Sequence, residues 1–111
     1  MKWKDDMSNE LDKIFIARIN NQSIETNSCC NKPELHIYAH KWDDKFSSGW
    51  IWCSQCKKYS HLDGIKLPNN WNNCELIDVD KLCAVPIYLE QNKNIIDVFM
   101  VGALDEKSLR L

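Results

Sequence analysis

The sequence predicts a small α+β fold in which a zinc-ribbon-like antiparallel β element is flanked by helices. Three observations favour it: helical apolar periodicity near the N-terminus, two-residue alternation in the middle of the chain, and cysteine clusters before and after that alternation. The 111 residues are enough for one domain, and we expect residues 1–111 to form it. A hydrophobic content of 44% with 27% charged residues is typical of a globular protein.

The first element expected is a helix over residues 8–20. Ser8 or Asn9 is expected to cap its start. A mostly apolar stripe with i, i+3, i+4, i+7 and i+8 spacing is formed by Leu11, Ile14, Phe15, Arg18 and Ile19. Because β-branched residues are common in this segment, a strand over 14–19 is the alternative.

Three short strands are expected in the middle of the chain. Residues 35–40 alternate between an aliphatic face and a face of two histidines and a tyrosine. Residues 50–53 are rich in aromatic and β-branched side chains, which favour strands. Residues 58–62 are expected to follow a tight turn and pair as the third strand, and residues 65–68 to form a short edge strand.

Helices are expected in the last third of the chain. Asp78 is suited to cap a short helix, and Pro86 fits the first turn of a helix over 87–92. The apolar run 95–101 suits either a strand or a helix and is expected to end at Gly102. The weakly amphipathic tail beyond it is expected to be a frayed helix.

Charge and hydropathy restrict the partners. A formal net charge of −2, with Lys57-Lys58 as the adjacent basic pair, argues against a nucleic-acid partner, which needs several basic groups on one face. No segment reaches the ~18 apolar residues of a membrane span, and residues 1–6 lack the apolar part of a signal peptide. We therefore expect a cytoplasmic protein, whose six cysteines are thiols or metal ligands. Export would make three disulfides the competing interpretation.

The spacing of four cysteines predicts a structural metal site. Cys53 and Cys56 form a Cys-x-x-Cys turn, which places two sulfurs on one ion. Cys29 and Cys30 lie upstream, across the first expected strand. Because structural zinc takes four nitrogen or sulfur ligands in a tetrahedron, these four cysteines are the predicted ligands of a zinc ion.

Other cysteines and histidines are weighed beside this set. Adjacent cysteines share one ion only with some backbone strain, so His61 or His40 is a possible substitute for one of the upstream pair. Cys74 and Cys83 stand apart and are expected to be ordinary buried thiols. Trp42 lies among charged residues, whereas Trp50 and Trp52 share one face of an expected strand. Trp42 is therefore the better candidate for an exposed aromatic side chain that anchors a binding partner.

Two kinds of chemistry compete with a structural site. The sequence around Cys53 is similar to the Trp-Cys-x-x-Cys of thioredoxin-like oxidoreductases, but those need a long helix after the motif, and residues 57–68 do not favour one. Catalytic zinc requires an open position and a nearby general base. Neither a His-x-Glu nor a His-Glu-x-x-His pattern is present, so no hydrolytic zinc chemistry is expected. A Cys/His nucleophile pair stays an open alternative, because both residue types are present, but no pattern selects one pair.

Several short motifs lie along the middle of the chain: Ser28-Cys29-Cys30-Asn31-Lys32, His36-Ile37-Tyr38-Ala39-His40, Trp50-Ile51-Trp52-Cys53-Ser54-Gln55-Cys56, Tyr59-Ser60-His61, and Pro68 with Trp71. Together they resemble the immunity proteins of bacterial polymorphic-toxin loci, including contact-dependent inhibition systems. The resemblance covers roughly residues 28–100, so segments 1–10 and 101–111 fall outside it.

This resemblance implies a binding protein that neutralises one cognate toxin in the cytoplasm of the producing cell. The expectation is therefore a non-catalytic, zinc-stabilised immunity protein whose partner is a toxin protein. Two alternatives remain: a zinc-ribbon nucleic-acid-binding or transcription accessory protein, and a thiol-disulfide oxidoreductase that uses Cys53 and Cys56.

Overall fold

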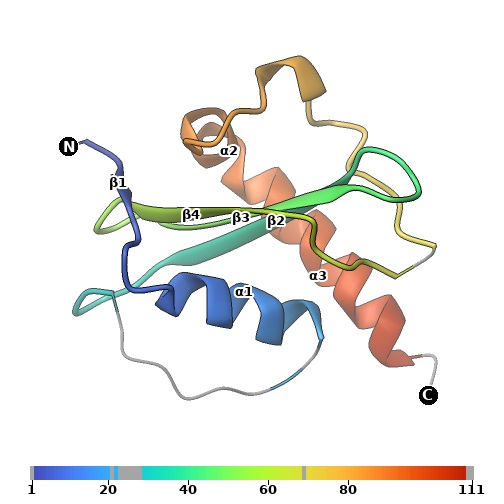
Figure 1. Ribbon diagram of the computed structural model, residues 1–111, viewed down its shortest axis with the longest axis horizontal. Coiled ribbons are helices and arrows are strands. Elements are labelled where there is room, and N and C mark those ends of the chain that lie inside the picture. Colours follow the sequence, from blue (N-terminus) through green and yellow to red (C-terminus); the bar gives the residue numbers. More distant parts are fainter. Residues whose placement is uncertain (1, 21, 23–28, 69, 110–111) are drawn as a thin grey trace.

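The fold is built on a four-stranded mixed sheet with helices on both faces (Figure 1). A computed structural model describes residues 2–20, 22, 29–68 and 70–109. The strands lie in the order β1-β4-β3-β2, with β1 parallel to β4 and the other pairs antiparallel. Their bounds are Lys4–Asp5 for β1, Leu35–Lys41 for β2, Ser47–Cys53 for β3 and Lys58–Asp63 for β4. The predicted α+β class is confirmed.

The antiparallel ribbon of β2, β3 and β4 matches the three predicted strands, whereas the edges of the sheet differ from prediction. β1 was not predicted, because its two residues form a strand only through the long-range pairing of Lys4 with Lys58. The edge strand expected over 65–68 is wrong. The chain turns at Gly64, which has a positive φ of 70°, and the outer edge of β4 is already occupied by β1.

The helices confirm one periodic pattern and resolve an ambiguous one. Helix α1 covers Glu10–Ile19, the 3-10 helix η1 covers Val79–Lys81, α2 covers Ile87–Gln91 and α3 covers Lys93–Leu109. The run 95–101 is therefore helical. The expectation that Gly102 ends it is wrong, because a glycine within a long helix costs only about 0.5–1 kcal/mol relative to alanine.

The start of α1 differs from the predicted cap. Asn9 occupies the N-cap position with a φ of 63° and makes no side-chain cap hydrogen bond. Instead the Asp6 carboxylate accepts a 2.9 Å hydrogen bond from the backbone N–H of Leu11. Burial opposes ionisation of Asp6, but this N–H, with hydrogen bonds from Ser8, lowers its pKa.

Both faces of the sheet are covered, α1 on one side and α2 with α3 on the other (Figure 1). On the α1 side the ring of Phe15 lies directly against Gly49, where a Cβ would come within 3.0 Å of three ring carbons. On the other side Tyr38 and Trp50 stack with ring centroids 5.9 Å apart, and both are buried, as is Trp52. The face predicted to carry histidines and tyrosine is therefore the face that α3 covers.

Candidate metal centre

Four cysteines meet at one end of the sheet. Cys53 ends β3, Cys56 lies in the turn to β4, and Cys29 with Cys30 lies in the loop before β2. The four Sγ atoms all lie within 4.8 Å of one another, and all four thiols are free. The Sγ of Cys30 is 3.8 Å from that of Cys53 and 4.0 Å from that of Cys29.

These separations are those of a tetrahedral thiolate site. A zinc–sulfur bond of about 2.3 Å gives a sulfur–sulfur edge of about 3.8 Å in a regular tetrahedron. The adjacent pair thus reaches the same point as the Cys-x-x-Cys turn. Four soft sulfur donors fit zinc, and they suit oxygen-preferring ions such as magnesium or calcium poorly.

The local backbone explains why the two downstream sulfurs converge. The N–H of Lys57 donates a 3.0 Å hydrogen bond to the carbonyl of Cys53, which closes the turn. Lys57 adopts a left-handed φ of 63°, which lets the chain reverse into β4 immediately after Cys56. The N–H of Ser54 donates a 2.9 Å hydrogen bond to the carbonyl of Glu34 and ties this turn to β2.

Burial and hydrogen bonds act on the sulfurs in opposite directions. Burial opposes ionisation of Cys53, but backbone N–H groups, chiefly those of Cys56 and Glu34, outweigh it and lower its pKa to about 7. Burial and the neighbouring thiols raise the pKa of Cys29, and burial with Cys53 raises that of Cys30. A divalent cation bound among the four sulfurs would favour their thiolate forms.

Neither histidine considered as a substitute belongs to this cluster of described residues. The ring of His61 stacks on Trp50, with centroids 4.9 Å apart, and its Nε2 lies 3.4 Å from Asp63. His40 is buried beside Tyr38, whose hydroxyl is 3.0 Å from its Nδ1, and burial lowers the pKa of His40. Among the described residues the cluster contains both Cys29 and Cys30, and no histidine takes the place of either one.

The burial of three residues outside the cluster, Cys74, Cys83 and Trp42, was also predicted. Cys74 is buried, as expected of an ordinary thiol. Cys83 is exposed, which contradicts the expectation of burial, because it lies between η1 and α2 rather than on the buried face of a helix. Trp42 is 44% exposed, in line with its predicted surface position.

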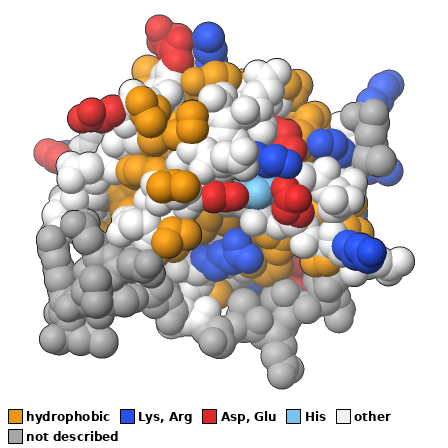
Figure 2. Space-filling view, turned by 180° about the vertical axis from the view of Figure 1, so that it is seen from behind, with side chains coloured by type: hydrophobic (Ala, Val, Ile, Leu, Met, Phe, Trp, Pro, Cys, Tyr) orange, Lys and Arg blue, Asp and Glu red, His pale blue; other side chains and the backbone are white. Residues whose placement is uncertain are grey.

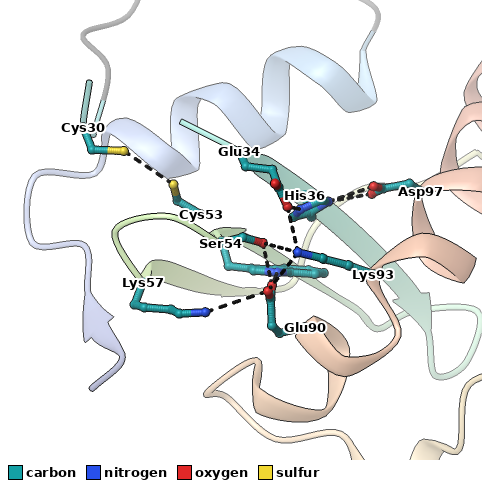
Figure 3. Close-up of polar contacts among 10 residues, drawn as sticks. Cys30, Glu34, His36, Cys53, Ser54, Lys57, Glu90, Lys93 and Asp97 are labelled. Carbon is teal, nitrogen blue, oxygen red and sulfur yellow. Dashed lines mark hydrogen bonds and ion pairs between the residues drawn. The ribbon is translucent and has the colours of Figure 1, made fainter. Parts of the chain in front are cut away.

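A polar network beside the cluster was not predicted (Figure 3). His36 is 6% exposed, with Nδ1 2.8 Å from an oxygen of Asp97 and Nε2 2.7 Å from one of Glu34. Both ring nitrogens of His36 therefore contact carboxylates. Lys93, followed by His36 and Ser54, lowers the pKa of Glu34 to about 2. His36 thus fastens β2 to α3 through contacts with two acidic side chains.

Comparison of the chain with protein-family models, with curated proteins and with solved structures finds no match. Among the described residues no helix combines the length and the apolar character needed to cross a membrane.

Ser54 and Lys93 lie close together but do not form a nucleophile with its base. Their Oγ and Nζ atoms are 3.5 Å apart. The carboxylates of Glu34 and then Glu90 raise the pKa of Lys93, which keeps its ammonium group protonated. The Ser54 hydroxyl donates its hydrogen bond to the carboxylate of Glu90. A serine nucleophile would instead need a neutral base that is oriented by a third group. This pair is suited to positioning rather than to proton abstraction.

Proposed function

We propose that the protein is a zinc-stabilised, non-catalytic binding protein. The observation that carries the proposal is the convergence of four cysteine sulfurs within 4.8 Å, at separations that suit one tetrahedral ion. Cys29, Cys30, Cys53 and Cys56 would supply all four ligands. A zinc ion held in this way keeps no position for a water molecule, so its contribution is to stability and not to hydrolysis.

We further propose that the binding partner is a bacterial toxin that this protein neutralises in the cytoplasm. The resemblance to immunity proteins supports this, and an exposed apolar surface offers a place for the contact. On α3, Ile95, Val98 and Val101 recur every three residues and are 40%, 76% and 60% exposed. Exposed apolar side chains gathered in this way mark interaction sites in soluble proteins.

Charge complements this apolar surface. The segment before α2 exposes Leu76 and Val79 together with the carboxylates of Glu75, Asp78 and Asp80. Figure 2 shows hydrophobic side chains gathered on the face that carries α3, with acidic side chains at the edge and also beside the histidine near the middle of the face. Such a surface complements a toxin region that is basic and partly apolar.

The experiment is co-expression with a candidate toxin, sought among the products of the neighbouring genes. Growth rescue together with a complex of the two purified proteins is the expected result, since neutralisation is by direct binding. Rescue is expected to fail when Cys53 and Cys56 are both replaced by serine, because the zinc-stabilised scaffold is lost. Absence of both rescue and complex for the unaltered protein would remove the immunity proposal.

A second candidate function is favoured by the Trp52-Cys53-Ser54-Gln55-Cys56 turn, in which both thiols are free. A thiol-disulfide oxidoreductase would use the Cys53 thiolate to attack a substrate disulfide, and Cys56 would then release the substrate as two thiols, leaving a Cys53–Cys56 disulfide. Reduction of insulin disulfides by the zinc-free protein with a thiol reductant would support it. If the Cys53→Ser variant reduced insulin as fast as the unaltered protein, the oxidoreductase function would be excluded.

A further inference from the structure

The carboxylate of Glu90, at the end of α2, is held largely by the turn that carries Cys53 and Cys56. Its Oε2 accepts hydrogen bonds of 2.8 Å from Trp52 Nε1 and 2.7 Å from Ser54 Oγ. Its Oε1 lies 3.8 Å from Lys57 Nζ and 3.3 Å from Lys93 Nζ. Three of these four partners therefore lie in residues 52–57, and Figure 3 shows two of them, Ser54 and Lys57, beside Glu90.

The same region fixes where α3 begins. Lys93 is the first residue of α3, and its ammonium group lies 2.9 Å from the carboxylate of Glu34 on the strand side. One turn later Asp97 is bonded to His36. The backbone carbonyl of Glu34 in turn accepts from Ser54. Ser54 thus contacts two residues that hold the α2–α3 junction. Its backbone N–H bonds to Glu34, and its hydroxyl bonds to Glu90.

Ser54 also lies between two of the four clustered cysteines. An ion bound to Cys53 and Cys56 would fix the turn at both ends, and the Ser54 hydroxyl would then be held facing Glu90. Without the ion the turn keeps the 3.0 Å bond that closes it but loses the restraint on its sulfurs. The side chains that satisfy Glu90, which has 18% side-chain exposure, would then lose their fixed position.

We propose that Ser54 and Glu90 couple metal occupancy of the four-cysteine site to the docking of the α2–α3 junction on the sheet. This inference rests on the proposed metal site and adds its regulation: zinc loading orders the junction from which the exposed stripe of α3 extends. Neither residue is a ligand; both act as positioning residues. Because coupling between two sites is reciprocal, groups that hold the junction must also strengthen zinc binding.

The first test is zinc affinity, measured by competition with a chromophoric chelator. Ser54→Ala and Glu90→Ala are expected to weaken zinc binding by about 10-fold or more, the usual effect of removing a supporting hydrogen bond around a metal site. Alanine favours helix, so the second variant leaves the propensity of α2 intact. The matched control is Ser60→Ala. Ser60 is a buried serine on β4, in the same β3–β4 hairpin as Ser54, but it bonds to Asp12 on α1 and lies away from the junction.

The second test is hydrogen exchange of the full chain with and without zinc. Removal of zinc is expected to speed exchange in residues 87–97 more than in α1, and Ser54→Ala is expected to show fast exchange at 87–97 even when zinc is bound. Equal zinc affinities for Ser54→Ala, Glu90→Ala and Ser60→Ala, or equal loss of protection in α1 and in 87–97, would overturn the coupling. An unaltered protein that binds no zinc would instead overturn the metal site, and the coupling with it.

Discussion

Cys30 and Cys53 are 23 positions apart in the chain, yet their sulfurs lie 3.8 Å from each other. The first lies in the loop before β2 and the second at the end of β3. An ion between them would therefore cross-link the upstream loop to the hairpin turn. This cross-link would hold residues 29–34, which the structure describes outside any strand or helix.

Replacement of Cys30 tests this cross-link. Cys30→Ser is expected to weaken zinc binding by more than about 100-fold, the upper range for removing a merely supporting group. It is also expected to lower the Tm by more than about 5 °C, since roughly 1 kcal/mol is worth that much in a domain of this size. Zinc content and thermal unfolding are the measurements. Cys83→Ser, at an exposed thiol outside the cluster, is the control and should match the unaltered protein.

Close contact between Gly49 and Phe15 gives a second prediction. Gly49→Ala is expected to destabilise the protein by about 1–3 kcal/mol, because Phe15 is buried and the added methyl overlaps its ring. Gly102→Ala is the matched change in open space, and it should stabilise α3 by about 0.5–1 kcal/mol. Urea unfolding measures both. A Gly49→Ala protein as stable as the unaltered one would contradict the packing of α1 on the sheet.

The low pKa of Glu34 predicts an acid-sensitive contribution to stability. Its folded pKa of about 2 lies below the ordinary 4.5, so its ionised form stabilises the fold above about pH 4.5, and this is lost as pH falls toward 2. The difference in unfolding free energy between the unaltered protein and Glu34→Gln should be constant from pH 7 to 5 and shrink below 4.5. Any zinc that acid releases would be lost from both proteins, so this loss would cancel in the difference. A difference that does not narrow would refute the ion pair with Lys93.

The exposed stripe of α3 predicts where the proposed toxin binds. Val98→Glu is expected to weaken the complex by at least about 10-fold, because it places a charge in an apolar contact. Ile16→Glu is the control, since Ile16 is 49% exposed on α1 at the other face of the sheet. Calorimetry with the purified toxin measures both. Equal affinities would place the contact elsewhere on the protein.

The parts of the fold that local patterns determine were predicted from sequence. The helical stripe of α1 and the alternation of β2 depend on neighbouring residues, and the four-cysteine set follows from turn geometry and spacing. The run 95–101 was ambiguous because its apolar residues suit a helix or a strand equally. Its helical state depends on burial of Ile96 and Met100 against the sheet, which local sequence does not reveal.

The polar network beside the metal centre could not be predicted, because its partners are far apart in sequence. His36 and Asp97 are separated by 61 positions, and Ser54 and Glu90 by 36. A histidine on a strand face gave no indication of which acid would approach it. Its only local sign was Glu34, two positions away, which turned out to bond the same ring.

We propose that one zinc ion is bound by four cysteine sulfurs. X-ray absorption at the zinc edge of the purified protein measures the number and the kind of its ligands. The expected result is one zinc per chain, surrounded by four sulfur atoms at about 2.3 Å. Absence of zinc, or nitrogen or oxygen atoms among its nearest neighbours, would contradict the assignment of Cys29, Cys30, Cys53 and Cys56 as its ligands.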